Sequence, residues 1–231
     1  HAGAIGDLSE AFPDTPIVVH PKGISHLEAP TRLWEGTLKT LADTARAYGP
    51  FKPVPAGRCV PADGDLPGPL TALATPGHAP HHISFLGEMG MFVGEAGGVR
   101  LELPDGDIYM RPATPPRFFP EVYLNSLALA AAQGPRRLFY GHFGMTADTS
   151  WLERHEEQIH LWMEVVAAQW RERGREANDA VVEACMAHLL AEDPHLSPFR
   201  RLSSPVRGRE RGFLRNSVLG MLGELAARQA P

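Results

Sequence analysis

Three short apolar runs in the middle of the chain end in the same way, at a turn containing glycine and then a histidine or a glutamate. Residues 70–75 precede Pro-Gly-His78, residues 91–94 precede Glu95, and residues 137–141 precede His142. Apolar runs of this length between turn residues are typical of buried β-strands. Glycine lets the backbone turn sharply where a strand ends. The pattern therefore predicts three polar side chains along one edge of a sheet.

These three side chains have the chemistry of metal ligands. Imidazole and carboxylate are the usual protein ligands of zinc, and they also suit iron and manganese. Each residue taken singly has a simpler explanation, because a histidine at a strand end is commonly a partly exposed polar residue and Gly-Glu after a strand is commonly a turn. Taken together, His78, Glu95 and His142 favour a metal site.

The rest of the chain predicts an α/β domain followed by helices. Apolar residues recur at helical spacing in three segments before residue 147, and two further runs have the length of strands. The predicted helices are residues 3–12, 31–48 and 120–133, and the further strands are residues 16–20 and 82–86. Residues 104–120 are rich in proline and have no regular period, which predicts a long surface loop.

After residue 147 the strand-like runs stop, and three helices are expected at residues 150–171, 175–191 and 210–228. The predicted fold class is therefore α/β with layered helices and strands, ending in an all-helical extension. We place the domain boundary between residues 146 and 147, which gives an α/β domain at 1–146 and a helical extension at 147–231.

The three ligand motifs resemble those of a known family. The segments Thr75-Pro-Gly-His-Ala-Pro-His-His82, Phe92-Val-Gly-Glu95-Ala and Tyr140-Gly-His142 are similar, in the same order, to the later ligand motifs of the metallo-β-lactamase superfamily. That family begins its site with His-x-His-x-Asp-His, and His1-Ala-Gly resembles the end of this motif. The resemblance implies a partial αββα sandwich and His1, His78, Glu95 and His142 as metal ligands. It also implies a cofactor of two zinc ions per intact protein, with iron or manganese as alternatives.

The sequence departs from the family pattern in two places. The family's bridging carboxylate is normally Asp, whereas Glu95 has one methylene more, which leaves open whether it bridges two metals or binds one. The first histidines and the Asp of the first motif would lie upstream of residue 1, where this Asp would be the proton-handling group. The resemblance therefore implies that the 231-residue chain alone binds metal weakly, exposes an apolar sheet edge or face, and shows no appreciable hydrolysis.

For the intact protein, the resemblance implies hydrolysis of a small-molecule substrate by a metal-bound hydroxide. An ester or thioester is the first expectation, and a lactone or β-lactam is the second. Residues 104–120 and the helical extension would select the substrate, and Arg111 is either a contact for an anionic group or a solvated loop residue. Two alternatives remain open: a degenerate, non-catalytic binding or regulatory module on the same fold, and a di-iron oxidoreductase.

The other histidines are predicted to have no role as ligands. His155 and His160 are five positions apart, so on a helix they point about 140° away from each other and cannot share a metal ion. His155 is expected in the packing seam of its helix, remote from the site, and His160 on the solvated side. His82 is expected to support the site rather than to bind the metal.

Charge and composition exclude several classes of protein. The net charge of −5 does not resemble the basic surface of a nucleic-acid binder. The two cysteines build no disulfide framework, which fits a cytoplasmic protein. The longest apolar runs are too short to span a membrane, so no membrane partner is expected. Association into oligomers would use the helical extension.

Overall fold

The structure is a computed structural model that describes residues 3–114 and 117–229, and the chain forms two compact units, His1–Ala72 and Leu73–Pro231. The N-terminal unit contains a parallel pair of strands in which Ile17 is opposite Cys59. Its elements are α1 (Ile5–Ala11), β1 (Ile17–Val19), α2 (Ile24–Glu28), α3 (Thr31–Leu41), α4 (Asp43–Tyr48) and β2 (Cys59–Pro61), with a 3-10 turn at Pro21–Gly23.

Of three predicted elements in the N-terminal unit, the structure confirms two and corrects one. The predicted helix at 3–12 and strand at 16–20 are confirmed by α1 and β1. The prediction of one continuous helix at 31–48 is wrong, because the chain breaks between α3 and α4 at Ala42, whose φ is 44°. A positive φ is incompatible with a right-handed helix. None of the described residues of α3 is fully buried, and its Trp34 is half-buried with its ring edge-on to Phe51.

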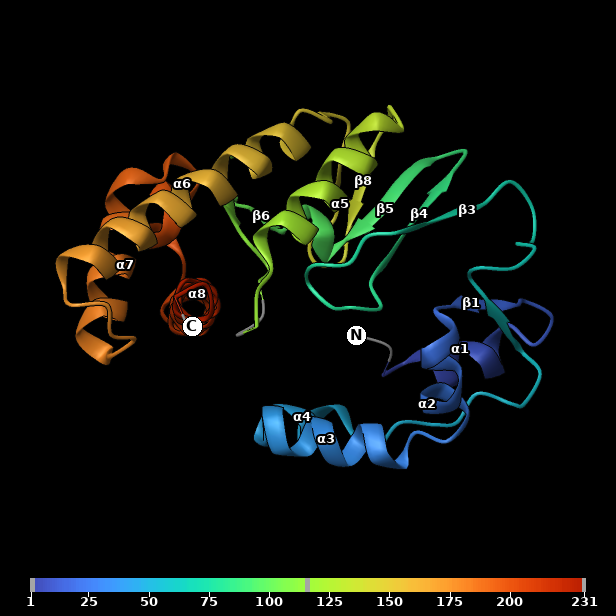
Figure 1. The fold of residues 1–231 in the computed structure, drawn as a ribbon. Helices are drawn as coiled ribbons and strands as arrows, with labels where there is room; N and C mark the ends of the chain where they lie inside the picture. Colours follow the sequence, from blue (N-terminus) through green and yellow to red (C-terminus); the bar gives the residue numbers. More distant parts are fainter. Residues whose placement is uncertain (1–2, 115–116, 230–231) are drawn as a thin grey trace. The chain divides into compact units, whose positions relative to one another are not determined.

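The C-terminal unit is built around a mixed sheet of five strands. Their order is β3-β4-β5-β8-β9, and β5 pairs antiparallel with β4 and parallel with β8. The helix α5 (Pro120–Ala132) lies along this sheet (Figure 1). The predicted strands are confirmed by β3 (Thr71–Ala74), β4 (Ile83–Gly87), β5 (Gly90–Gly94) and β8 (Leu138–Tyr140). The fifth strand of the sheet is β9 (Met145–Thr146).

The prediction of a long surface loop at 104–120 is wrong. The segment contains β7 (Ile108–Arg111), which forms an antiparallel hairpin with β6 (Val99–Glu102). Tyr109 and Met110 of this hairpin are fully buried. The bulky residues of β7 favour a strand, and the prolines flank it instead of interrupting it, so the density of prolines misled the sequence interpretation.

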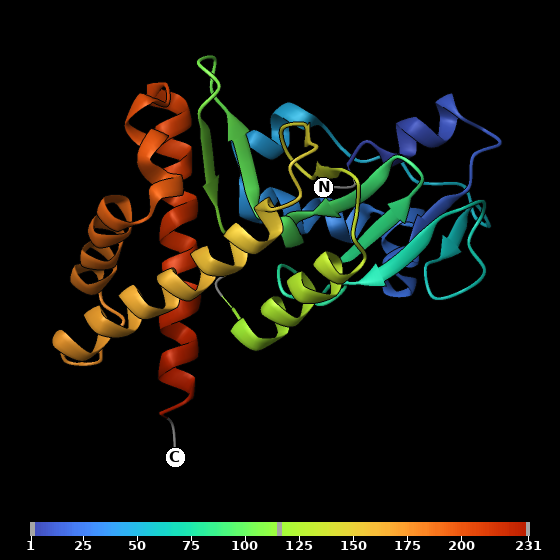
Figure 2. The same cartoon turned by 90° about the horizontal axis from the view of Figure 1, so that it is seen from above.

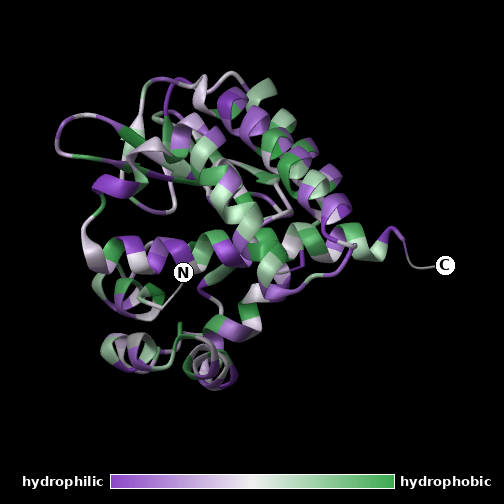
Figure 3. Cartoon of the chain, turned by 90° about the vertical axis from the view of Figure 1, so that its left-hand side faces the viewer, coloured by the Kyte–Doolittle hydropathy of each residue, from purple (hydrophilic) through white to green (hydrophobic). Residues whose placement is uncertain are grey.

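The chain after residue 150 is helical, as predicted. It consists of α6 (Trp151–Glu172), α7 (Asp179–Glu192), a 3-10 segment (Pro194–Arg201) and α8 (Ser204–Ala227), and α6 crosses the long α8 (Figure 2). Along these helices apolar and polar residues alternate in bands (Figure 3). No helix within the described residues is long and apolar enough to cross a membrane.

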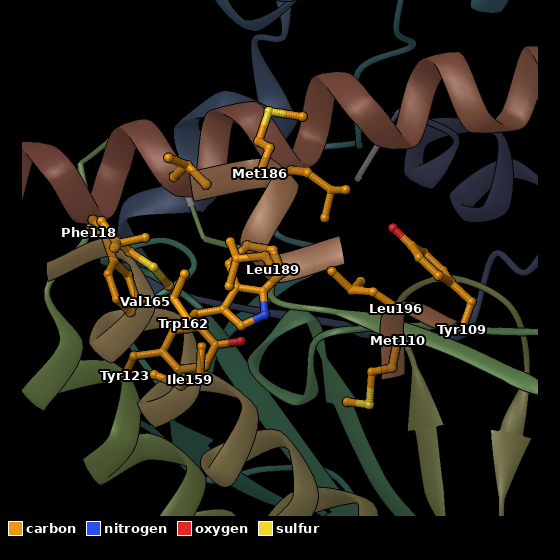
Figure 4. Packing of buried hydrophobic residues seen from close by; sticks show 14 of the residues in the cluster. Tyr109, Met110, Phe118, Tyr123, Ile159, Trp162, Val165, Met186, Leu189 and Leu196 are labelled. Atoms are coloured by element: carbon orange, nitrogen blue, oxygen red, sulfur yellow. The ribbon is translucent and has the colours of Figure 1, made fainter. Parts of the chain in front are cut away.

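One hydrophobic cluster joins the sheet to these helices. Met91 of β5 and Leu138 of β8 belong to the same cluster as Trp162 of α6 and Val218 of α8, and all four are fully buried. Trp162 lies among Tyr123, Ile159 and Leu189 in the close view of this cluster (Figure 4). The two compact units of the structure divide between Ala72 and Leu73, which is a different place in the chain. The domain boundary between residues 146 and 147 stays a prediction.

A buried ion pair ties the β6–β7 hairpin to α8. The Arg111 guanidinium donates from Nε to the Glu210 carboxylate, and the two side chains are 7% and 2% exposed. The Tyr109 hydroxyl donates to the same carboxylate at 3.4 Å. Of the two roles that the sequence left open for Arg111, a contact for a substrate and a solvated loop residue, the structure supports neither.

We expect Glu210→Ala to lower the free energy of unfolding by about 3–5 kcal/mol, because it leaves the Arg111 charge buried without its partner. The control is Arg201→Ala, which removes ion pairs with Asp105 and Asp107 on the surface. Exposed ion pairs contribute about 0–1 kcal/mol to stability, so the free energy of unfolding of this variant should be close to that of the wild type. Urea unfolding followed by circular dichroism measures both, and equal effects of the two substitutions would contradict the role given to the buried pair.

Candidate metal centre

Three of the four predicted ligands meet at one end of the sheet. Glu95 lies between two histidines: its Oε2 is 2.9 Å from His78 Nε2, and its Oε1 is 3.3 Å from His142 Nε2. The Glu95 side chain is 12% exposed, whereas those of His78 and His142 are 24% and 34% exposed. The cluster is thus shielded on the carboxylate side and open to solvent on the side of His142.

Glycines at the strand ends allow this convergence. Gly94 at the end of β5 has a φ of +60°, and a Cβ built on it would lie only 2.6 Å from His82 Nε2. Gly77, just before His78, has a φ of +144°, and its Cβ would lie 2.6 Å from the Tyr123 ring of α5. Any other residue at either place would push the ligand segment away from the structure beneath it.

The His78 ring is oriented by the main chain. Its Nδ1 donates to the carbonyl oxygen of Ala113 at 2.7 Å, which directs Nε2 toward Glu95. Histidine ligands of metals usually make this bond with their other ring nitrogen, since it fixes both the tautomer and the ring plane.

Imidazole nitrogens and a carboxylate are the donor types that a divalent cation takes in proteins. Two imidazole nitrogens face one carboxylate, and each carboxylate oxygen faces a different imidazole. His1, the fourth predicted ligand, lies outside the described residues. Between residues 3 and 229, as far as the structure describes them, no three His, Cys, Asp or Glu side chains form a ready-made metal-binding group.

His82 contacts the main chain of Glu95 instead of joining the ligand cluster. Its Nε2 accepts a hydrogen bond from the Glu95 N–H at 3.2 Å, and its Nδ1 lies 2.9 Å from Thr75 Oγ1. Burial, and to a smaller extent the neighbouring His78, lowers the pKa of His82 to about 4. His82 is therefore neutral at physiological pH.

His155 is closer to the cluster than the sequence predicted. It is fully buried in α6, as expected, but its Nε2 lies 2.9 Å from the Tyr123 hydroxyl. Gln158 Oε1 can only accept, so the neutral His155 carries its proton on Nδ1 and accepts at Nε2. The single proton of the Tyr123 hydroxyl is therefore shared between His155 Nε2 and the main-chain oxygen of Glu95, which lies 3.0 Å from that hydroxyl. The prediction that His155 is remote from the site is wrong in this respect, whereas His160 is exposed, as predicted.

The sequence interpretation missed Tyr123, Thr75 and Ser84 as supports of the site. The signal for Ser84 was a hydroxyl in the middle of an apolar strand, where a buried polar group needs a partner. The signal for the α6 contacts was a polar pair, His155 and Gln158, within an otherwise apolar seam. Tyr123 gave none, because its sequence neighbours are those of an ordinary helix.

Comparison with known proteins adds a family to this geometry. The family model of the metallo-beta-lactamase superfamily matches residues 1–142. Among solved structures, a metallo-beta-lactamase superfamily protein from the archaeon Sulfolobus tokodaii is 19% identical with a TM-score of 0.62, over 95% of this chain and 74% of its own. A metallo-beta-lactamase family protein from Thermus thermophilus is 19% identical with a TM-score of 0.57, over 100% of this chain and 72% of its own.

At this identity the two structures show likeness of fold alone. No sequence among the curated proteins matches significantly. The family match covers more than half of the chain and ends at His142, the last of the three clustered ligand candidates. The chain belongs to the metallo-β-lactamase superfamily.

Proposed function

We propose that the protein is a metal-dependent hydrolase in which His78, Glu95 and His142 bind the metal. The observation that carries this proposal is the partly buried carboxylate with one imidazole nitrogen on each side of it. Membership of the superfamily supports it. Zinc is the first choice for this donor set, and iron or manganese would be held by the same atoms.

The chain's own residues divide the work at such a centre. The Ala113 carbonyl holds the His78 ring so that Nε2 is presented to the metal. Glu95 would offer one oxygen toward each histidine, and its shielded position keeps competing water away. His142, a third exposed, marks the side from which a small-molecule substrate would approach.

A divalent cation bound there would supply Lewis-acid chemistry, lowering the pKa of a water molecule and polarising a carbonyl oxygen. Ester or thioester carbonyls are the proposed substrates, since each offers an oxygen to polarise and a leaving group that departs readily. Lactones and β-lactams have the same electrophile within a ring and are the second class to assay.

The ligand role of His78 can be tested without any substrate. His78→Ala should weaken Zn²⁺ binding by more than the roughly 10–100-fold typical for losing a residue that only supports a ligand. Competition with a chromophoric chelator measures the affinity. The matched control is His160→Ala, which removes an exposed histidine from α6 and should leave the affinity unchanged. Equal affinities for the wild type and His78→Ala would refute the assignment.

The hydrolytic activity needs a second assay. We compare the 231-residue chain with the same chain preceded by a strand ending in His-x-His-x-Asp, each supplied with Zn²⁺. Hydrolysis of p-nitrophenyl acetate and of a thioester is expected only with the added motif, and it should be lost on chelation and in His78→Ala, because both remove the bound metal. Hydrolysis that persists with chelator present would overturn the proposal, and metal binding without hydrolysis of any ester, thioester, lactone or β-lactam would favour a non-catalytic module.

A further inference from the structure

The main chain of Glu95 is held by side chains at both of its polar groups. Its N–H donates to His82 Nε2 at 3.2 Å, and its carbonyl oxygen, 3.0 Å from the Tyr123 hydroxyl, shares the proton of that hydroxyl with His155 Nε2. The same carbonyl accepts from Gly98 N at 3.1 Å, which closes the short 3-10 turn Glu95–Gly97. Three separate parts of the chain thus converge on one residue's main chain.

A chain of hydrogen bonds from the Val93 carbonyl oxygen to His82 sets which ring nitrogen of His82 carries the proton. Ser84 Oγ donates its single proton to the Val93 carbonyl at 3.1 Å, so toward Thr75 Oγ1, 2.9 Å away, it can only accept. The Thr75 hydroxyl therefore donates its proton to Ser84 Oγ and must accept a hydrogen bond from His82 Nδ1 at 2.9 Å. His82 is left with a lone pair on Nε2, which is the atom that meets the Glu95 N–H.

This chain of bonds is insulated from water. Thr75 and Ser84 are both fully buried, so no solvent molecule competes for their protons. The bonds also connect three strands: Thr75 follows β3, Ser84 lies in β4, and Val93 lies in β5. Removal of the Thr75 or the Ser84 hydroxyl would leave a buried polar atom without its hydrogen-bond partner. The proton of His82 would then no longer be fixed on Nδ1.

On the carbonyl side, the support comes from the helices. Tyr123 of α5 is fully buried, and its hydroxyl lies 2.9 Å from Nε2 of the buried His155 of α6. His155 Nδ1 donates to Gln158 Oε1 at 3.1 Å, so His155 Nε2 accepts a share of the Tyr123 proton. The Gln158 amide nitrogen donates to the Met110 carbonyl and to Asp193. The tyrosine is thereby anchored to a network that spans α6, β7 and the start of the 3-10 segment after α7.

We infer that His82 and Tyr123 are positioning residues that clamp the main chain of Glu95, with Thr75 and Ser84 fixing the tautomer that His82 needs. The clamp holds the Glu95 side chain between His78 and His142. A carboxylate on a freely rotating turn would have to be ordered by the metal itself, whereas a clamped one is ordered beforehand. The inference rests on the proposed function and deepens it, since it concerns the same site.

The clamp is tested first in the metal-free chain. His82→Leu should speed hydrogen exchange of the Glu95 amide about tenfold, because one hydrogen bond is lost. His82→Gln should restore part of the protection, since its side-chain oxygen can accept from the same N–H. Ring ¹⁵N chemical shifts should show His82 protonated at Nδ1 in the wild type and in a mixture of tautomers in Thr75→Val.

Two matched controls separate positioning from general stability. Thr114→Val removes another buried hydroxyl, one that has no hydrogen-bond partner among the described residues, and Tyr109→Phe removes another buried tyrosine hydroxyl that faces Glu210. Both should leave exchange at Glu95 unchanged, whereas Thr75→Val should speed it, and Tyr123→Phe should speed exchange at Gly98 by loosening the same turn.

Co²⁺ binding then connects the clamp to the metal site. His82→Leu and Tyr123→Phe should each weaken Co²⁺ affinity about 10–100-fold and alter its visible spectrum, with partial recovery in His82→Gln. Unchanged exchange and unchanged affinity in both variants would overturn the clamp while leaving the proposed function intact. A wild-type chain that binds no Co²⁺ but shows the predicted exchange pattern would instead overturn the proposed function and leave the clamp standing.

Discussion

The turn at Gly94 is the constraint on which the site depends. The strand β5 must end there in a left-handed conformation, with the His82 ring pressed against the glycine where a Cβ would be. Only a glycine satisfies both demands. Only this turn brings the next residue, Glu95, back between the histidines that follow β3 and β8. The position of Glu95 between His78 and His142 thus depends on the geometry of the strand ends as much as on the identity of these three residues.

The helices of the C-terminal unit are structurally coupled to that cluster. The same hydrophobic cluster contains residues of the sheet and of α6, α7 and α8, so these helices do not form a separate core. Two polar connections run through it: the Arg111–Glu210 ion pair joins the hairpin to α8, and His155 with Tyr123 joins α6 to the Glu95 turn. Such buried polar connections cost free energy when incomplete, so they fix one arrangement of the helices relative to the strands.

Much of the fold could be predicted because its signals are local, whereas the errors came where tertiary context decided the structure. Apolar runs closed by Pro-Gly or Gly marked β3, β4, β5 and β8, and the spacing of apolar residues marked α5 to α8. Residues 108–111 became a buried strand despite the surrounding prolines, and the helix at 31–48 broke at Ala42, for which the sequence offers no glycine or proline as a warning. The candidate ligands His78, Glu95 and His142 share a visible pattern, in which a glycine and then a residue able to bind metal follow a strand. Their supports reach the Glu95 turn through contacts between distant segments, which no local pattern encodes.

We propose that His78, Glu95 and His142 share one metal site, and X-ray diffraction of the Zn²⁺-soaked protein at the zinc absorption edge would locate the bound ion. We expect an anomalous peak about 2.0–2.2 Å from His78 Nε2 and from a Glu95 carboxylate oxygen. A peak only at other histidines, such as His160 or His188, with Glu95 still bonded directly to His78, would contradict it.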